Sequence, residues 1–246
     1  MDSAALERRL AGARSYEDWV TALADVFTAH GLVFGHGTDN ASDEAFWLVR
    51  HVQRWDETAW QRRPEHALIA PVVARARRRV EERAPLAYGL GEAWFAGLRF
   101  RVDERVLVPR SPLAEVIERG FAPWRALHPG DRVLDIGTGS GCLAIATAAY
   151  WPDVAVDATD VSAAALEVAR ENAASHGVAQ RVRLIEADLF PQRGGPYRVI
   201  ISNPPYVPAA ELTDLPAEYR REPGVALEGG ATGLREVDRI LRGAVR

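Results

Sequence analysis

Hydrophobic residues recur at helical intervals in the first third of the chain. Trp19, Leu23 and Phe27 follow one another at spacings of four residues, a pattern that predicts an amphipathic helix with one buried face. Ser15 and Asp18 precede this pattern with the spacing of a capping box, in which each side chain accepts a hydrogen bond from the other residue's backbone. The helix is therefore predicted to begin directly after Ser15.

Two more helices are predicted before residue 84, so that residues 1–84 form a helical N-terminal domain. Ser42 can cap the first of them. The second runs from Ala67 to Arg83, where Pro71 either starts the helix or kinks it. The inner face of the first helix is assigned to Phe46, Trp47, Val49 and Val52. The second helix carries a basic run that we interpret as a solvated face rather than an RNA contact: Arg75, Arg77, Arg78 and Arg79.

From Ala93 to Pro109 the hydrophobic period changes to two. Apolar residues alternate with polar residues on both sides of Asp103 and Glu104, which predicts a β-hairpin that turns at this pair. We expect this hairpin to form a link, residues 85–112, between two domains. Helical structure is expected to resume at Ser111-Pro112, because proline is tolerated in the first turn of a helix.

Beyond residue 113, short apolar runs alternate with helical stretches. Four of these runs are predicted to be strands: Val133–Ile136, Val154–Asp160, Arg181–Ala187 and Val199–Ser202. Helices are expected over Cys142–Ala149, after Ser162, and over Gly233–Val245. Strands that alternate with helices form parallel sheets. The predicted fold class is therefore α/β, with a doubly wound, Rossmann-like sheet in residues 113–246.

Composition narrows the possible partners and the compartment. The chain is 48% hydrophobic and 26% charged, and its net charge of −4 argues against a nucleic-acid backbone as the main target. The single cysteine, Cys142, excludes an intrachain disulfide, and the histidines show no metal-ligand spacing, so no metal site is expected. No apolar stretch is long enough to span a membrane, and we expect a cytoplasmic protein.

The fourth predicted strand ends at Asn203-Pro204-Pro205-Tyr206. Prolines have no N–H to donate, and a residue that precedes proline is held extended, so this corner is stiff and offers carbonyl acceptors only. Asn203 adds a side-chain carbonyl, and Tyr206 adds a flat apolar face. Such a corner suits a planar substrate that carries an NH₂ group. The alternative is a proline-rich loop that closes the strand, with Tyr206 merely packing.

The first strand of the predicted sheet carries Asp135 and ends in a glycine-rich turn, Gly137-Thr138-Gly139-Ser140-Gly141. Glycines allow the backbone to approach a ligand closely, and the N-terminus of the following helix presents backbone amides. Folds that bind dinucleotides use a similar device. The turn therefore predicts a cofactor site without deciding which cofactor binds there.

Two acidic residues follow the second and third strands. Asp160 stands at the tip of the second strand, where it can accept hydrogen bonds from ribose hydroxyls. Asp188 follows the third strand and could bind an adenine amino group, while Leu189 packs on the ring. Either acid alone is better explained as a loop residue or helix cap. Their succession after the glycine turn and before the proline corner favours a nucleoside-containing cofactor.

Together these residues resemble class I S-adenosylmethionine-dependent methyltransferases that modify amino groups or amides. The sequence is most similar to bacterial protein-(glutamine-N5) methyltransferases, and within them to the branch that modifies the third protein of the large ribosomal subunit. Three segments carry this likeness: residues 36–40, 102–112 and 214–220. The release-factor branch is similar but usually has Pro-Asp in place of Ser111-Pro112.

The resemblance implies a different role for each of three parts of the chain. Residues 1–84 would recognise the substrate, residues 85–112 would link, and residues 113–246 would bind S-adenosylmethionine, which leaves as S-adenosylhomocysteine. Cofactor contacts are implied for Asp135, Gly137, Thr138, Gly139, Ser140, Gly141, Asp160, Asp188, Leu189 and Asn203. The catalytic residues would be Asn203, Pro204 and Tyr206. The substrate glutamine would contact Asn203, Pro204, Pro205, Tyr206 and Arg110.

The implied partner is a protein, either a ribosomal protein or a release factor, with no membrane and no direct nucleic-acid target. The family fold continues with three more strands beyond the fourth, and we expect these to be missing here, which leaves the fourth strand at a bare edge. Other functions remain open. A nicotinamide-dependent oxidoreductase would leave the proline corner unexplained, a shortened relative could bind protein without transferring methyl groups, and methylation of DNA amines is disfavoured by the acidic charge.

Overall fold

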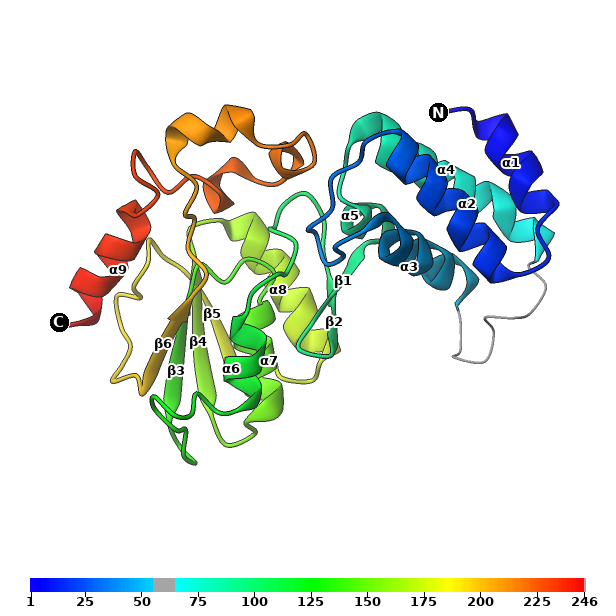
Figure 1. Ribbon diagram of the computed structural model, residues 1–246. Helices are drawn as coiled ribbons and strands as arrows, with labels where there is room; N and C mark the ends of the chain where they lie inside the picture. The colour runs from blue at the N-terminus through cyan, green and yellow to red at the C-terminus, as the bar shows by residue number, and fades with distance from the viewer. Residues whose placement is uncertain (55–64, 246) are drawn as a thin grey trace. The chain divides into compact units, whose positions relative to one another are not determined.

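The computed structural model of this protein describes residues 1–54 and 65–245 (Figure 1). The chain divides into two compact units. The helical unit comprises Met1–Gly91 together with Pro216–Arg221, and the sheet unit comprises Glu92–Leu215 together with Glu222–Arg246. The chain therefore passes from one unit to the other three times. Among the described residues, no helix is long and apolar enough to cross a membrane.

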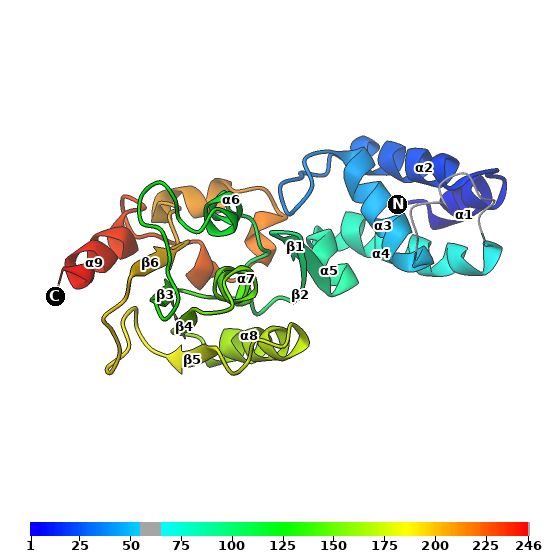
Figure 2. The same ribbon diagram turned by 90° about the horizontal axis from the view of Figure 1, so that it is seen from below.

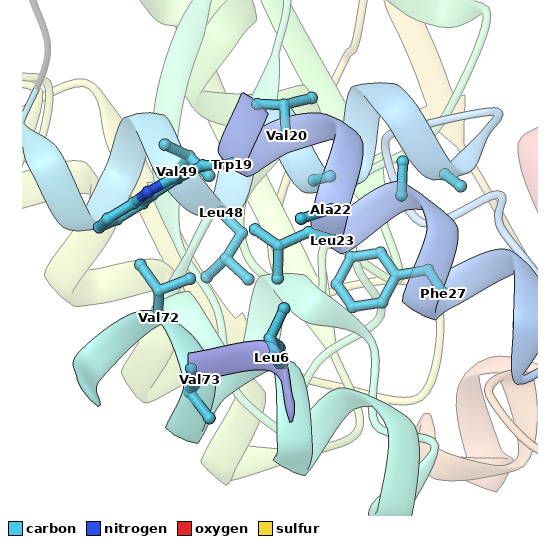
Figure 3. Packing of buried hydrophobic residues seen from close by; sticks show 14 of the residues in the cluster. Leu6, Trp19, Val20, Ala22, Leu23, Phe27, Leu48, Val49, Val72 and Val73 are labelled. Carbon is cyan, nitrogen blue, oxygen red and sulfur yellow. The ribbon is translucent and has the colours of Figure 1, made fainter. Parts of the chain in front are cut away.

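The helical unit contains five α-helices in the described part of the chain. They are α1 (Ser3–Ala11), α2 (Tyr16–Ala29), α3 (Ala41–Gln53), α4 (Ile69–Glu82) and α5 (Leu86–Leu90), with 3-10 turns at His66–Leu68 and Tyr219–Arg221. Trp19, Leu23 and Phe27 lie in one buried cluster with Leu48 and Val72 (Figure 3). The four-residue spacing on α2 is thus confirmed as the face that packs inward, where burial of large apolar side chains stabilises the unit.

The capping box at the start of α2 is confirmed. The Asp18 backbone N–H donates to Ser15 Oγ at 3.2 Å, and the Ser15 N–H donates to Asp18 Oδ2 at 3.1 Å. The prediction that Ser42 caps the next helix is wrong. Asn40 has the extended backbone that a cap requires, and its Oδ1 accepts the Asp43 N–H at 2.9 Å, so Ser42 already lies within the helix.

Glu44 of α3 and Arg79 of α4 are charged and buried, which the sequence pattern did not predict. The most buried positions of α3 are Ala41, Glu44, Ala45, Leu48 and Val49, whereas Phe46, Trp47 and Val52 are only partly buried. Glu44 accepts a hydrogen bond from Arg79 of α4, and both side chains are excluded from water. The basic run is therefore not uniformly solvated. Arg77 and Arg78 are exposed and pair with acids one turn later, but Arg79 is a core residue.

Pro71 neither starts α4 nor lies at a kink within it. It occupies the third position of α4, within the first turn, where backbone N–H groups have no partner inside the helix. The missing N–H of proline therefore costs no hydrogen bond at this position.

The sheet unit is built on a parallel sheet, which confirms the predicted fold class. Its strands are β3 (Arg132–Ile136), β4 (Ala155–Asp160), β5 (Val182–Glu186) and β6 (Val199–Ser202), hydrogen-bonded in the order β5-β4-β3-β6. Its helices are α6 (Leu113–Glu118), α7 (Cys142–Tyr150), α8 (Ala163–Ser175) and α9 (Arg235–Ala244), with 3-10 turns at Ala209–Asp214 and Gly224–Ala226. Helices α7 and α8 cover one face of the sheet (Figure 2).

A charged cluster lies on the opposite face of the sheet. Asp157 of β4 accepts hydrogen bonds from Arg132 at 2.7 Å, Arg183 at 2.7 Å and Tyr197 at 2.6 Å. Burial raises the pKa of Asp157, but the hydrogen bonds from Arg183 and Tyr197 outweigh it, and its pKa lies below the usual value. The cluster ties the loop that carries Tyr197 to the sheet.

The hairpin is present, but the prediction of its turn is wrong. Strands β1 (Glu92–Phe95) and β2 (Leu98–Arg101) pair antiparallel and turn at Ala96-Gly97, where φ is 48° and 68°. Two left-handed residues give the turn that best matches strand twist. Asp103 instead closes a local turn by accepting the Arg105 N–H at 3.1 Å.

In the four-stranded sheet, β6 is an edge strand, and no described strand pairs with its outer side. Helix α9 begins within the predicted range Gly233–Val245. Near its end, Gly243 contacts the ring of Phe190 in the loop after β5, so closely that a Cβ at this position would overlap the ring. The helix is thereby held against the loop between β5 and β6.

The two serines of the helical unit give a matched test of this capping assignment. Ser15→Ala removes the Oγ that accepts the Asp18 N–H at the start of α2, and we expect the free energy of unfolding to fall by about 1 kcal/mol. Ser42→Ala removes no cap, so its effect is expected to stay within about 0.5 kcal/mol. Urea denaturation followed by circular dichroism measures both, and equal losses would contradict the assignment.

Candidate active site

The pairing of β3 with β6 brings the two predicted motifs to one edge of the sheet. Ile136 stands opposite Ser202 in the parallel register, and Ser202 Oγ donates to the Ile136 carbonyl at 2.7 Å. The chain runs from β3 to β4 on one side, while β6 lies on the other side. Strand order therefore reverses between β3 and β6, which is where open α/β sheets bind their ligands.

A cavity of about 350 Å³ opens at this edge, within the size range of small-molecule sites. Its walls include most of the residues that the sequence predicted: Arg110, Gly137, Thr138, Gly139, Ser140, Asp160, Asp188, Leu189, Asn203, Pro204 and Pro205. Three predicted residues do not line it, namely Asp135, Gly141 and Tyr206. The glycine turn and the proline corner thus share one space.

The glycine turn leaves open space above two of its glycines. Its first two amides, from Gly137 and Thr138, both donate to the Thr159 carbonyl at 2.9 Å, so the turn is fixed by its own hydrogen bonds. A Cβ placed at Gly137 or Gly139 would meet nothing within 4 Å, and the space above them is open to a ligand. Gly141 differs, because a Cβ there would lie 2.8 Å from Ile145 at the start of α7.

Asp160 is oriented by the backbone on both sides. Its Oδ2 accepts the Gly139 N–H at 2.8 Å, and its Oδ1 accepts the Ser162 N–H at 2.9 Å. A carboxylate oxygen can accept a second hydrogen bond, so the carboxylate can still take hydroxyl donors from the cavity. Ser162 is confirmed as the cap of α8, since its Oγ accepts the Ala165 N–H at 3.2 Å.

Asp135 lies behind the turn and is completely buried. Its Oδ2 accepts Thr138 Oγ1 at 2.6 Å and the Ala144 N–H at 3.2 Å, whereas its Oδ1 has no hydrogen-bond partner among the described residues. Burial raises the pKa of Asp135 to about 7, and the hydrogen bonds from Thr138 and Ala144 offset this only in part. The side chain therefore supports the turn from beneath and does not line the cavity.

Asp188 and Leu189 form the far wall, and helix α9 joins them there. Asp188 accepts a hydrogen bond from Arg239 Nη2 at 2.6 Å, which lowers the pKa of this carboxyl. Leu189 has φ of 70°, and its carbonyl accepts Thr159 Oγ1 at 2.6 Å. Four residues of α9 complete this wall: Arg235, Glu236, Arg239 and Ile240. The sequence analysis missed them because α9 follows a long irregular loop.

The proline corner forms part of the cavity wall. Asn203, Pro204 and Pro205 line it, and no described residue hydrogen-bonds the side-chain amide of Asn203. That amide is therefore available to a ligand. Tyr206 is 61% exposed and lies outside the lining of the cavity. Directly after it, the Val207 N–H donates to the Leu227 carbonyl at 2.8 Å.

Arg110 is held by an acid that the sequence analysis did not single out. Its two terminal nitrogens donate to the two carboxylate oxygens of Glu222, at 2.7 Å and 2.6 Å. The Glu222 side chain is fully buried and also accepts the Val108 N–H at 3.0 Å. This paired geometry fixes the plane of the guanidinium at the cavity wall. A glutamate before a proline is too common in sequences to have predicted it.

Asn172 of α8 is a second residue that the sequence did not reveal. Its Nδ2 donates to the Ser140 carbonyl at 2.9 Å and to the Arg101 carbonyl at 3.0 Å, and its Oδ1 accepts the Arg101 N–H at 2.7 Å. One buried amide thus joins the glycine turn, the hairpin and α8. In the part of the chain that the structure describes, no group of three or more His, Cys, Asp or Glu could hold a metal ion.

Comparison with known proteins places this geometry in a family. The Methyltransferase small domain model matches residues 124–218. The ribosomal protein uL3 glutamine methyltransferase of Bordetella pertussis is 44% identical over 237 residues, which cover 94% of this chain and 80% of that protein. The chain belongs to the ribosomal protein uL3 glutamine methyltransferase family. The resemblance seen in the sequence is thereby confirmed, and S-adenosylmethionine is the cofactor of this class of enzyme.

Other family members agree. Those of Xylella fastidiosa strain 9a5c and Burkholderia pseudomallei are 47% and 43% identical, over 90% and 95% of this chain and 72% and 80% of their own. Among solved structures, the hMettl16 catalytic domain in complex with MAT2A 3'UTR hairpin 1 is 14% identical, with a TM-score of 0.48 over 80% of this chain and 72% of that one. A TM-score this low supports no conclusion about ligands.

The burial of Asp135 predicts a defined pH dependence of stability for this member of the family. Its pKa is about 7 in the folded protein, against 3.8 for the free side chain. Between these values the folded protein keeps a proton that the unfolded chain releases, so the free energy of unfolding falls as the pH rises from about 4 to 7. Above pH 7 both states are ionised, and this contribution is constant.

Asp135→Asn removes this titration. The melting temperature of the variant, relative to the natural protein, is therefore expected to rise between pH 5 and pH 8, by about 2 °C or more. Differential scanning calorimetry at both pH values measures the difference. A difference that stays the same at both pH values would contradict the raised pKa of Asp135.

Proposed function

We propose that this protein transfers a methyl group from S-adenosylmethionine to the side-chain amide nitrogen, N5, of a glutamine in ribosomal protein uL3. One observation carries the proposal. The unpaired amide of Asn203 and the prolines beside it line the same cavity as the glycine turn. Five relatives that are 43–48% identical to this chain carry the name ribosomal protein uL3 glutamine methyltransferase.

The cavity fits the methyl donor in shape and in chemistry. The open space above Gly137 and Gly139 would hold the amino-acid portion of the donor. The carboxylate of Asp160 would accept hydrogen bonds from the ribose hydroxyls. Leu189 would pack on the adenine ring, with Asp188 near its amino group. When bound, S-adenosylmethionine supplies a methyl group on a sulfonium cation and leaves as neutral S-adenosylhomocysteine.

The protein's own contribution is to orient a poor nucleophile. The lone pair of a carboxamide nitrogen is delocalised into its carbonyl group. Asn203 Oδ1 and the Pro204 carbonyl would each accept one of the two amide hydrogens, which holds the nitrogen with its lone pair directed at the methyl group. As the nitrogen gains positive charge, these acceptors bind more strongly, and the barrier falls.

The proton balance requires no strong base in the cavity. The nitrogen becomes acidic once it carries the new methyl group, so it loses one of its hydrogens to water. Glu222 is committed to Arg110 and the Val108 amide and is not the acceptor of that proton. Arg110 instead would face the substrate with a fixed guanidinium. The exposed ring of Tyr206, which lies outside the cavity lining, would cover the glutamine side chain only from beyond the cavity.

The choice of protein substrate is assigned to residues 1–84, proposed here as the recognition domain. A ribosomal protein substrate places the reaction in the cytoplasm. A release factor is the less favoured alternative, because the relatives named above carry the name of uL3. Direct action on nucleic acid is not expected from the net charge of −4.

Asn203→Ala tests the acceptor corner. We expect methyl transfer to slow by about 30- to 900-fold, which corresponds to a loss of about 2–4 kcal/mol of transition-state stabilisation. The measurement is transfer of labelled methyl to purified uL3 at saturating donor. Gln180→Ala removes an exposed amide in a turn of the same unit and serves as the matched control. Near-normal turnover by the Asn203 variant would refute the role of the corner.

Substrate identity is tested by competition. Labelled S-adenosylmethionine is offered with uL3 and a release factor at equal concentration, and the label is expected on a uL3 glutamine. Tryptic mass spectrometry locates the added methyl group. Label on the release factor alone would overturn the substrate, and binding of uL3 without any transfer would support a non-catalytic relative instead.

A further inference from the structure

One buried side chain joins three parts of the sheet unit. Asn172 of α8 is 1% exposed, and both hydrogens of its Nδ2 are used: one bonds the Ser140 carbonyl at 2.9 Å and one the Arg101 carbonyl at 3.0 Å. Its Oδ1 accepts the Arg101 N–H at 2.7 Å. Because peptide carbonyls can only accept, this amide has a single orientation. All three residues lie within Glu92–Leu215, in the same compact unit.

The Ser140 end of this contact belongs to the cavity. Ser140 lines the cavity and directly precedes Gly141, the N-cap of α7. The Gly141 N–H donates to the Thr138 carbonyl at 2.8 Å, so one side of the Ser140–Gly141 peptide is fixed inside the glycine turn. Asn172 fixes the carbonyl side of that peptide from α8. The conformation of the turn therefore depends on a side chain outside it.

The Arg101 end of the contact belongs to the hairpin. Arg101 is the last residue of β2, and its backbone exchanges two hydrogen bonds with Asn172, as it would with a residue of a neighbouring strand. The chain then turns and becomes part of the cavity wall, which residues 105–107 and 109–111 line. The contact that holds Arg101 thus also holds the start of the wall that carries Arg110.

A second contact holds the hairpin on α8 independently of the turn. His176, the C-cap of α8, donates through Nε2 to the Arg99 carbonyl at 2.8 Å, and its ring packs on Phe100 with 5.1 Å between ring centroids. None of its hydrogen bonds reaches a described residue of the glycine turn. His176 therefore anchors the same strand as Asn172, four residues further along the same helix.

We propose that Asn172 is a positioning residue that couples the S-adenosylmethionine site to the β1–β2 hairpin. Its single amide holds the Ser140 carbonyl and the Arg101 backbone together, so the glycine turn and the wall beyond the hairpin keep one relative position. This inference rests on the proposed function, in which that wall faces the substrate glutamine. An opening that undocks the hairpin leaves buried carbonyls unpaired and loosens the turn. A ligand that binds only the ordered turn therefore also favours the docked hairpin.

The matched pair Asn172→Ala and His176→Ala tests the proposal. Both variants remove an anchor of the hairpin on α8, but only Asn172 also holds the glycine turn. Asn172→Ala is expected to raise the Kd for S-adenosylhomocysteine by about tenfold, because binding must then order the turn. His176→Ala is expected to keep this Kd within about twofold of the natural value. Isothermal titration calorimetry, well below the melting temperature of each variant, measures both.

Hydrogen exchange in the natural protein gives a readout that needs neither activity nor a variant. None of the residues 92–101 lines the cavity, so S-adenosylhomocysteine does not cover the hairpin amides. At about 100 times its Kd, it is expected to slow their exchange by up to about 100-fold, because openings that undock the hairpin also break the binding site. Mass spectrometry of peptic peptides follows this exchange, and the core strand β3 is the reference for global unfolding.

The two variants are expected to differ in this slowing, with the ligand concentration adjusted to the Kd of each. In His176→Ala the hairpin is expected to exchange faster but still to be slowed by S-adenosylhomocysteine. In Asn172→Ala it is expected to exchange faster and to lose any slowing beyond that of β3. Slowing retained in Asn172→Ala, or an unchanged Kd, would show a merely structural amide and overturn the proposal. Absence of slowing in the natural protein would overturn it as well.

Asn172→Asp is the second variant, should Asn172→Ala fail to fold. It has nearly the same shape and keeps an acceptor for the Arg101 N–H, but its carboxylate has no N–H for the Ser140 carbonyl. We expect weaker binding of S-adenosylhomocysteine and loss of the slowing, and natural values of both would contradict the coupling. If the natural protein binds this ligand but methylates nothing, the proposed function fails, while the exchange measurement still decides the role of Asn172.

Discussion

The parallel pairing of β3 with β6 is the constraint on which the site depends. Ile136 and Ser202 are neighbours in that register, and each is followed at once by one of the two turns that line the cavity. A shift by one residue would turn Ser202 to the other face of the sheet and break its hydrogen bond to the Ile136 carbonyl. The distance between donor site and acceptor corner is therefore set by sheet hydrogen bonds, before any side chain of either turn contributes.

Features encoded by local spacing were predictable from the sequence. The capping box at Ser15, the apolar stripe through Trp19 and the four strands of the sheet unit each depend on residues close together in the chain. The glycine turn and the proline corner were also placed correctly at strand ends, and the structure puts them on one cavity. Their roles in binding and catalysis follow from chemistry and stay predictions.

Features that depend on distant partners were not predictable. In the sequence, Glu222 looks like an ordinary surface acid, because its partner Arg110 lies far earlier in the chain. Arg79 looked like one of a solvated basic run, because nothing near it in sequence shows that Glu44 and Glu218 are buried beside it. The hairpin turn was misplaced for a different reason. Ala96 accepts a left-handed conformation that is uncommon for alanine, while Asp103-Glu104 looked more turn-like and is occupied by a local carboxylate contact.

The acceptor corner has a consequence for how this enzyme can change. The Pro204 carbonyl belongs to the main chain, so exchanging side chains cannot retune it, and replacing either proline would loosen the corner altogether. If the corner acts as proposed, exchanges of side chains leave this acceptor of the reaction centre unchanged. A related enzyme with a different target protein would have to differ at the surfaces that contact the polypeptide around the glutamine. The chemistry at the amide would stay the same.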